Sequence, residues 1–109
     1  MADHPHRLDP PIKAVIDATN AGNGKAFAAA FANDATINDW GEVHAGRNQI
    51  GKWDREHNSG TRPKLEVTGV SRLGGEILVL LRITRGEETE TGTWSFRLSG
   101  KQVASLEIG

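Results

Sequence analysis

Few side chains in this 109-residue sequence combine a suitable type with a suitable position for acid/base chemistry. Asp39 stands out, because it lies near the end of a short stretch, Ala35 to Trp40, whose pattern predicts a strand. A carboxylate held among apolar side chains can take a proton from one carbon of a bound ketone and return it to another. The same residue precedes Trp40-Gly41, so it can instead bridge a turn and meet solvent. Both roles are open for Asp39.

Two histidines are the other acid/base candidates. A predicted helix from about Arg47 to His57 places His57 on one face with Trp53, where it can act as the acid or base partner of Asp39. At the end of that helix, the same histidine can interact with the last backbone carbonyls. His44 lies in the predicted loop before Gly46, where it faces either the mouth of a pocket or solvent.

Metal and cofactor chemistry find little support in the sequence. There are no cysteines, which excludes disulfides, thiolate catalysis and cysteine zinc sites. Asp3, His4 and His6 lie in a predicted mobile leader, which is a poor metal cage, and no H-x-x-x-H spacing occurs. No phosphate-binding glycine motif precedes a helix. We therefore expect no metal and no cofactor.

Composition narrows the classes of partner. The net charge is −1 and the 13 Lys and Arg residues are scattered, whereas nucleic acids and anionic membranes require a concentrated basic face. No apolar run approaches the roughly 20 residues that span a bilayer, and none follows the N-terminus as in a secretory signal. We expect a cytoplasmic protein with a flexible leader, residues 1–8, and one domain, residues 9–109.

The first half of the chain has helical periodicity. Asp9-Pro10-Pro11 is typical of a helix start, and the following helix should end before Gly22, a residue suited to the left-handed cap position. A second helix is predicted from about Gly24 to Ala32. The strand 35–40, a loop from Gly41 to Gly46 and the third helix follow.

From Lys64 onward the period changes to two. Strands are predicted over residues 65–71, 76–85, 91–99 and 102–108, joined by short turns. Trp94, Phe96 and Leu98 should share one face of their strand, with Arg97 among the polar residues of the other face. Helices followed by a run of strands predict an α+β domain with the helices on one face of a mainly antiparallel sheet.

One stretch narrows this prediction to a family. The segment F31-A-N-D-A-T-I-N-D-W-G-E-V-H-A-G-R-N-Q-I50 resembles the signature of the nuclear-transport-factor-2-like superfamily, SnoaL-like branch. Members show an aromatic residue, an Asn-Asp or acidic pair, a short strand, and then Gly-Arg with an aliphatic residue opening the third helix. The resemblance implies a cone, in which three helices close the open side of a strongly curved sheet.

The resemblance also implies a chemistry, since SnoaL-type polyketide cyclases and ketosteroid isomerases are similar in this stretch. Asp39 falls where the isomerases have their general-base aspartate, and the pocket would be lined by Trp40, His44, Trp53, Trp94 and Phe96. The isomerases also use a tyrosine and a second, protonated aspartate to stabilise the enolate oxygen. Those positions fall near Val15 and Trp94, and the chain has no tyrosine. The usual steroid isomerase mechanism is therefore not expected.

Two functions follow from these observations. The first is an acid/base enzyme of isomerase, cyclase or dehydratase type that acts on a small hydrophobic carbonyl compound, with Asp39 as base. The second is a non-catalytic homodimeric module that binds an apolar small molecule or a protein. The resemblance implies that the dimer forms through the outer face of the sheet, where Arg82 would be an interface residue. Arg82 can alternatively anchor an anion in the pocket.

Overall fold

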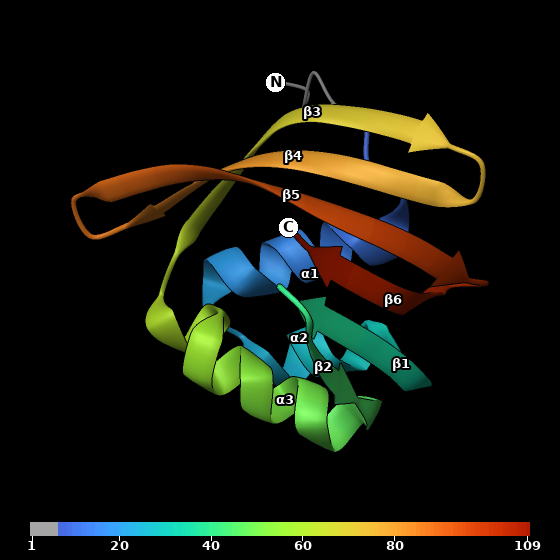
Figure 1. The fold of residues 1–109 in the computed structure, drawn as a ribbon. Helices are drawn as coiled ribbons and strands as arrows, with labels where there is room; N and C mark the ends of the chain where they lie inside the picture. The colour runs from blue at the N-terminus through green and yellow to red at the C-terminus, as the bar shows by residue number, and fades with distance from the viewer. Residues whose placement is uncertain (1–6) are drawn as a thin grey trace.

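The structure, a computed structural model, describes residues 7–109 and has an α+β architecture of three helices packed on a six-stranded sheet (Figure 1). The elements, in chain order, are α1 (Pro10–Ala21), α2 (Gly24–Ala29), β1 (Phe31–Asp39), β2 (Glu42–Ala45), α3 (Gly46–His57), the short 3-10 helix η1 (Ser59–Thr61), β3 (Lys64–Leu73), β4 (Glu76–Arg85), β5 (Glu88–Ser99) and β6 (Gln102–Ile108). The predicted fold class is confirmed.

The strands follow the order β2-β1-β6-β5-β4-β3, and every neighbouring pair is antiparallel except β1 and β6. The sheet is strongly curved. Strands β3, β4 and β5 arch over α1, whereas β1 and β2 lie against α3 (Figure 1). The helices therefore occupy the concave side, which we call the inner face, and the opposite side is the outer face.

Alternation along the strands decides which side chains enter the core. On β5, Trp94 and Phe96 share one face, as predicted, and this face points inward, so that they are 3% and 0% exposed. They meet Ile12 and Val15 of α1 and Phe27 of α2 in one hydrophobic cluster. The outer face of the same strand carries threonine, serine and arginine, so one face of the sheet builds the core and the other is largely polar.

Two helix ends differ from the prediction. The second helix ends at Ala29 rather than near Ala32, because the chain extends at Phe31 to pair with Val103 of β6. Asp9 occupies the N-cap position of α1, but its side chain makes no cap hydrogen bond. Its carboxylate instead accepts a 2.6 Å hydrogen bond from Arg72 of β3. Gly22 adopts the expected left-handed cap conformation, with φ of 67°.

The predicted loop 41–46 contains a strand. Residues Glu42 to Ala45 form β2, which pairs with β1 through a two-residue hairpin whose turn is Trp40-Gly41. Both turn residues have positive φ, 52° for Trp40 and 98° for Gly41. Hairpins of this kind favour Asn-Gly, because an L-residue with a bulky side chain is strained in the left-handed region. Trp40 therefore carries a conformational cost.

Replacing Trp40 with asparagine should raise the free energy of unfolding by about 0.5–1 kcal/mol, because asparagine tolerates the left-handed conformation. The indole is 78% exposed, so little packing is lost. Thermal unfolding followed by circular dichroism measures the effect. Trp40→Val provides the contrast, since a β-branched residue should lower the melting temperature at the same position. A lower melting temperature for Trp40→Asn than for the wild type would contradict the claim that the left-handed conformation of Trp40 is strained.

No helix within residues 7–109 is long and apolar enough to cross a membrane. The same part of the chain holds no cluster of three His, Asp or Glu side chains that could bind a metal ion. Asp3, His4 and His6, which were considered as ligands, lie outside the described residues, as does most of the predicted flexible leader.

Candidate functional site

Asp39 ends β1 with its side chain directed to the inner face, towards α3. The indole Nε1 of Trp53 donates a 2.9 Å hydrogen bond to its Oδ2 atom. Trp53 is only 3% exposed and packs against the Phe27 ring, with 6.1 Å between the ring centroids, so the donor is held rigidly. Asp39 itself is half-buried, and its Oδ1 atom accepts no hydrogen bond from residues 7–109. One carboxylate oxygen is thus fixed and the other is free.

A second polar pair lies beside this carboxylate. Glu42 pairs with Asp39 across the hairpin, and His44 pairs with Ile37, so both side chains project to the inner face. His44 Nε2 lies 3.0 Å from Glu42 Oε1, and the His44 side chain is 19% exposed. Its ring centroid is 6.4 Å from that of Trp53. His44 therefore faces inward, next to the hydrogen-bonded pair of Asp39 and Trp53.

Trp94 lies in the same cross-strand row as Asp39. Asp39 pairs with Ile108 of β6, and Ile108 pairs with Trp94 of β5. Neighbouring strands are about 4.8 Å apart, so the Cα atoms of Asp39 and Trp94 are separated by about 10 Å. The Trp94 indole N–H donates no hydrogen bond within residues 7–109, and Ile108 is only half-buried. Asp39, Ile108 and Trp94 thus lie in register on the inner face.

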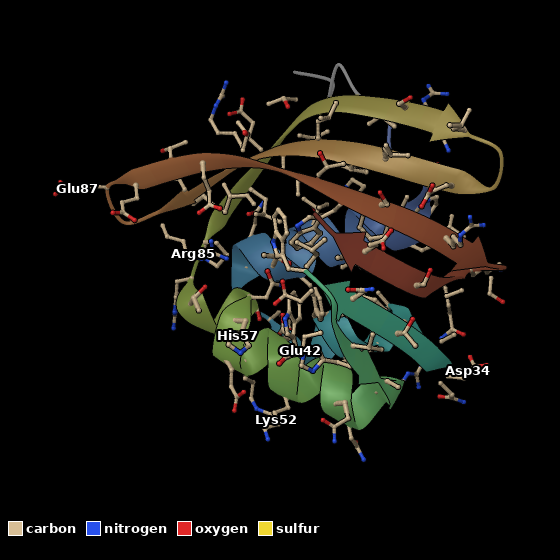
Figure 2. All side chains as sticks on the ribbon, in the orientation of Figure 1. Asp34, Glu42, Lys52, His57, Arg85 and Glu87 are labelled. Atoms are coloured by element: carbon tan, nitrogen blue, oxygen red, sulfur yellow. The ribbon has the colours of Figure 1, made fainter. Side chains whose placement is uncertain are left out.

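His57 is not part of this group. The prediction that it shares the buried face of α3 with Trp53 is wrong, since its side chain is 55% exposed and 4.0 Å from Glu56 (Figure 2). Beyond the end of the helix, Asn58 and Ser59 are buried, whereas His57 is not. The His57 carbonyl accepts a hydrogen bond from Arg85.

Trp40 and Phe96 also lie apart from Asp39. The prediction that Trp40 lines the surroundings of Asp39 does not hold in this structure, because the hairpin turn directs the indole into solvent, 78% exposed. Phe96 has no exposed surface and packs on Trp94, with 6.3 Å between the ring centroids. Phe96 therefore supports the Trp94 ring but does not reach the polar side chains of Asp39, Glu42 and His44.

A concave site that the sequence analysis missed lies on the outer face. This pocket has a volume of about 370 Å³ and is lined by Asn38, Trp40, Gly41, Thr93, Ser95, Glu107, Ile108 and Gly109. The polar members come from three neighbouring strands, and their alternation with inward residues is visible in the sequence. Only the parallel pairing of β1 with β6 brings them together, and nothing in the sequence analysis predicted that pairing.

Solved structures resemble this one over nearly its full length. A Sinorhizobium meliloti protein with a provisional polyketide cyclase assignment has a TM-score of 0.84 and 25% identity, covering 94% of this chain and 95% of its own. A Kribbella flavida protein with a provisional ketosteroid isomerase assignment has a TM-score of 0.79 and 20% identity, covering 92% of this chain and 74% of its own. A nuclear-transport-factor-2-like protein of unknown function from Cytophaga hutchinsonii has a TM-score of 0.76 and 15% identity, covering 97% of this chain and 93% of its own.

No family model and no curated protein matches the sequence. The identification therefore depends on the three-dimensional likeness together with the element order and the curved sheet described above. The chain has the nuclear-transport-factor-2-like fold.

Proposed function

We propose that the protein is an acid/base enzyme of isomerase, cyclase or dehydratase type, acting on a small hydrophobic carbonyl compound with Asp39 as the base. The observation that carries this proposal is the asymmetric environment of the Asp39 carboxylate. Oδ2 is held by the buried Trp53 N–H, and Oδ1 is unpaired among residues 7–109. A general base needs this combination of fixed orientation and a free oxygen.

The proposed reaction is a proton transfer next to a carbonyl group. Asp39 Oδ1 takes a proton from the carbon beside the carbonyl, the electron pair of the broken C–H bond forms an enolate, and the proton returns to another carbon. The Trp94 N–H, in the same cross-strand row, donates to the enolate oxygen. In this proposal the Trp94 N–H takes the place of the tyrosine and aspartate donors of the isomerases. The other donor position falls near Val15, which is fully buried and has no donor group.

His44 is the second acid/base group of the proposed site, in place of His57. It lies on the inner face beside Trp53 and is paired with Glu42. Such a pair can hold the imidazole in one orientation and pass a proton to the substrate or to water. The provisional assignments of the similar structures as polyketide cyclase and ketosteroid isomerase agree with carbonyl chemistry, but they name no substrate for this chain.

Asp39→Asn should lower the rate of proton exchange beside the carbonyl by about 10²–10⁴-fold, because the amide cannot accept the proton. The asparagine oxygen can still accept the Trp53 N–H bond, so the melting temperature should stay close to that of the wild type. The measurement is deuterium incorporation from D₂O into cyclohexanone, cyclohexenone and 2-tetralone, followed by proton NMR.

Asp34→Asn is the matched control, since Asp34 is an exposed aspartate of the same strand and should leave the exchange rate unchanged. Exchange at the wild-type rate in folded Asp39→Asn would refute the assignment of the base. A wild-type protein that exchanges none of these ketones would leave the non-catalytic module as the better description.

One observation favours that second candidate, a homodimer formed through the outer face. Within residues 7–109, the large hydrophobic side chains that remain exposed are Trp40, Val43, Leu73 and Leu80, at 78%, 59%, 75% and 45%. The strand registers place Val43, Leu73 and Leu80 on the outer face, and Trp40 lines the pocket on that face. Arg82 also projects there and binds Glu66. Light scattering tests this candidate, because a mass near that of the 11.8 kDa chain at micromolar concentration would contradict it.

A further inference from the structure

The outer-face pocket is separate from the inner-face group around Asp39. Its floor is a row of three side chains in register, Asn38 of β1, Glu107 of β6 and Ser95 of β5. Thr93 and the hairpin turn Trp40-Gly41 complete the wall. The Asn38 side-chain oxygen already accepts a 2.7 Å hydrogen bond from the Gly41 amide, which holds the turn against the pocket. The volume of about 370 Å³ lies within the range of small-molecule sites.

Trp40 is the unusual member of this pocket. It occupies a left-handed position at a conformational cost, and 78% of its surface is exposed, so folding does not account for a tryptophan here. Backbone outliers of this kind cluster at functional sites, where a side chain is needed despite the strain. The exposed indole offers an electron-rich face at the edge of the pocket.

The charge of the pocket is the second guide to its ligand. Glu107 lies between Asn38 and Ser95, both neutral, and forms no ion pair within residues 7–109. The two outer-face arginines of β4 and β5 are engaged or directed elsewhere. Arg82 binds Glu66, and the Arg97 guanidinium lies beside Gly75, at the turn between β3 and β4. The pocket thus combines one uncompensated carboxylate with hydroxyl groups and an aromatic face.

We propose that the outer-face pocket binds a small organic cation, an alkylammonium group that lies against Trp40 and is neutralised by Glu107. A cation over the face of a tryptophan is attracted by the ring quadrupole. The Glu107 carboxylate adds a Coulomb attraction, and the Ser95 and Thr93 hydroxyls accept hydrogen bonds from a ligand N–H or O–H group.

The test is an NMR titration of the full chain with choline chloride, following the backbone amides of Thr93 and Ser95. Saturable shifts with a dissociation constant in the millimolar range are expected. Trp40→Asn, which keeps the turn, and Glu107→Gln should each weaken binding about fivefold, the equivalent of about 1 kcal/mol. Glu90→Gln removes a charge outside the pocket and should bind as the wild type does. Asp39→Asn should also bind normally, so this result is independent of the catalytic proposal.

The uncharged isostere 3,3-dimethylbutan-1-ol separates charge recognition from apolar contact. Binding of the alcohol as tightly as choline would overturn the proposal, as would the absence of saturable shifts across the millimolar range. If the Thr93 and Ser95 signals respond to protein concentration and not to choline, the pocket is occupied by a second copy of the chain and the cation site is rejected.

Discussion

Replacing Gly60 with alanine should destabilise the protein by about 4 kcal/mol, a large share of the 5–15 kcal/mol that holds a typical domain folded. A Cβ atom at this position would lie 1.8 Å from the backbone oxygen of Arg55 and 2.6 Å from its carbonyl carbon. Neither neighbour is a flexible side chain, so η1 and the last turn of α3 would have to separate. Urea unfolding followed by tryptophan fluorescence measures the loss.

Gly51→Ala is the matched control. It also adds one methyl group to a glycine, but within α3, where the nearest atom to the new Cβ is the flexible guanidinium of Arg55 at 3.6 Å. Alanine has the higher helix propensity, so this variant should be more stable by up to about 1 kcal/mol. The two substitutions should therefore shift the urea midpoint in opposite directions. Equal midpoints for Gly60→Ala and the wild type would show that the approach of η1 to α3 is not tight.

Asp54→Ala should cost about 3 kcal/mol, because it removes the acceptor at the centre of a buried polar network. Asp54 is fully buried and accepts hydrogen bonds from Asn58 Nδ2 at 2.8 Å, from the Ser59 backbone amide at 3.2 Å and from the Ser59 hydroxyl. Asn58 Nδ2 also binds Thr19 of α1, so the network joins α3 to α1. Without the carboxylate, these buried donors lose their partner.

Thermal and urea unfolding of three variants test this assignment. Asp54→Asn keeps an acceptor oxygen and should lose less than Asp54→Ala. Asp17→Ala removes an aspartate whose side chain is 60% exposed in an i,i+4 pair with Lys13, and it should change the free energy of unfolding by at most about 0.5 kcal/mol. Equal losses of unfolding free energy in Asp54→Ala and Asp17→Ala would refute the claim that the buried network stabilises the protein.

The sequence predicted those elements whose periodicity is long and whose ends carry turn residues. The bounds of β4 and β6 are as predicted, because alternating residues run between Gly74-Gly75, Gly86 and Gly100. The third predicted helix is also present as α3, and Trp53 lies on its buried face. The local sequence pattern is sufficient to predict an element where its buried residues recur with a regular period.

The sequence did not predict features that depend on distant contacts. Strand β2 has four residues between two glycines, too few for a recognisable alternation, and it exists because β1 supplies its partner. The outward direction of Trp40 depends on the hairpin that β1 and β2 form. Asp39 was selected as the candidate base from its place at the end of a predicted strand, but its hydrogen bond to Trp53 could not be predicted locally, because it joins residues of two different elements.

The position of β6 has a consequence for how the chain acquires its structure during synthesis. The last strand lies between β1 and β5, so it is the piece that joins the β1–β2 hairpin to the β3–β4–β5 meander. Until residues 102–108 leave the ribosome, the two halves form separate sheets, each with an unpaired edge. The β1–β6 pairing links residues about 70 positions apart, and closing such a loop is slow. The six-stranded sheet should therefore be completed only once residues 102–108 are available, and until then the edges of β1 and β5 that β6 covers are unpaired.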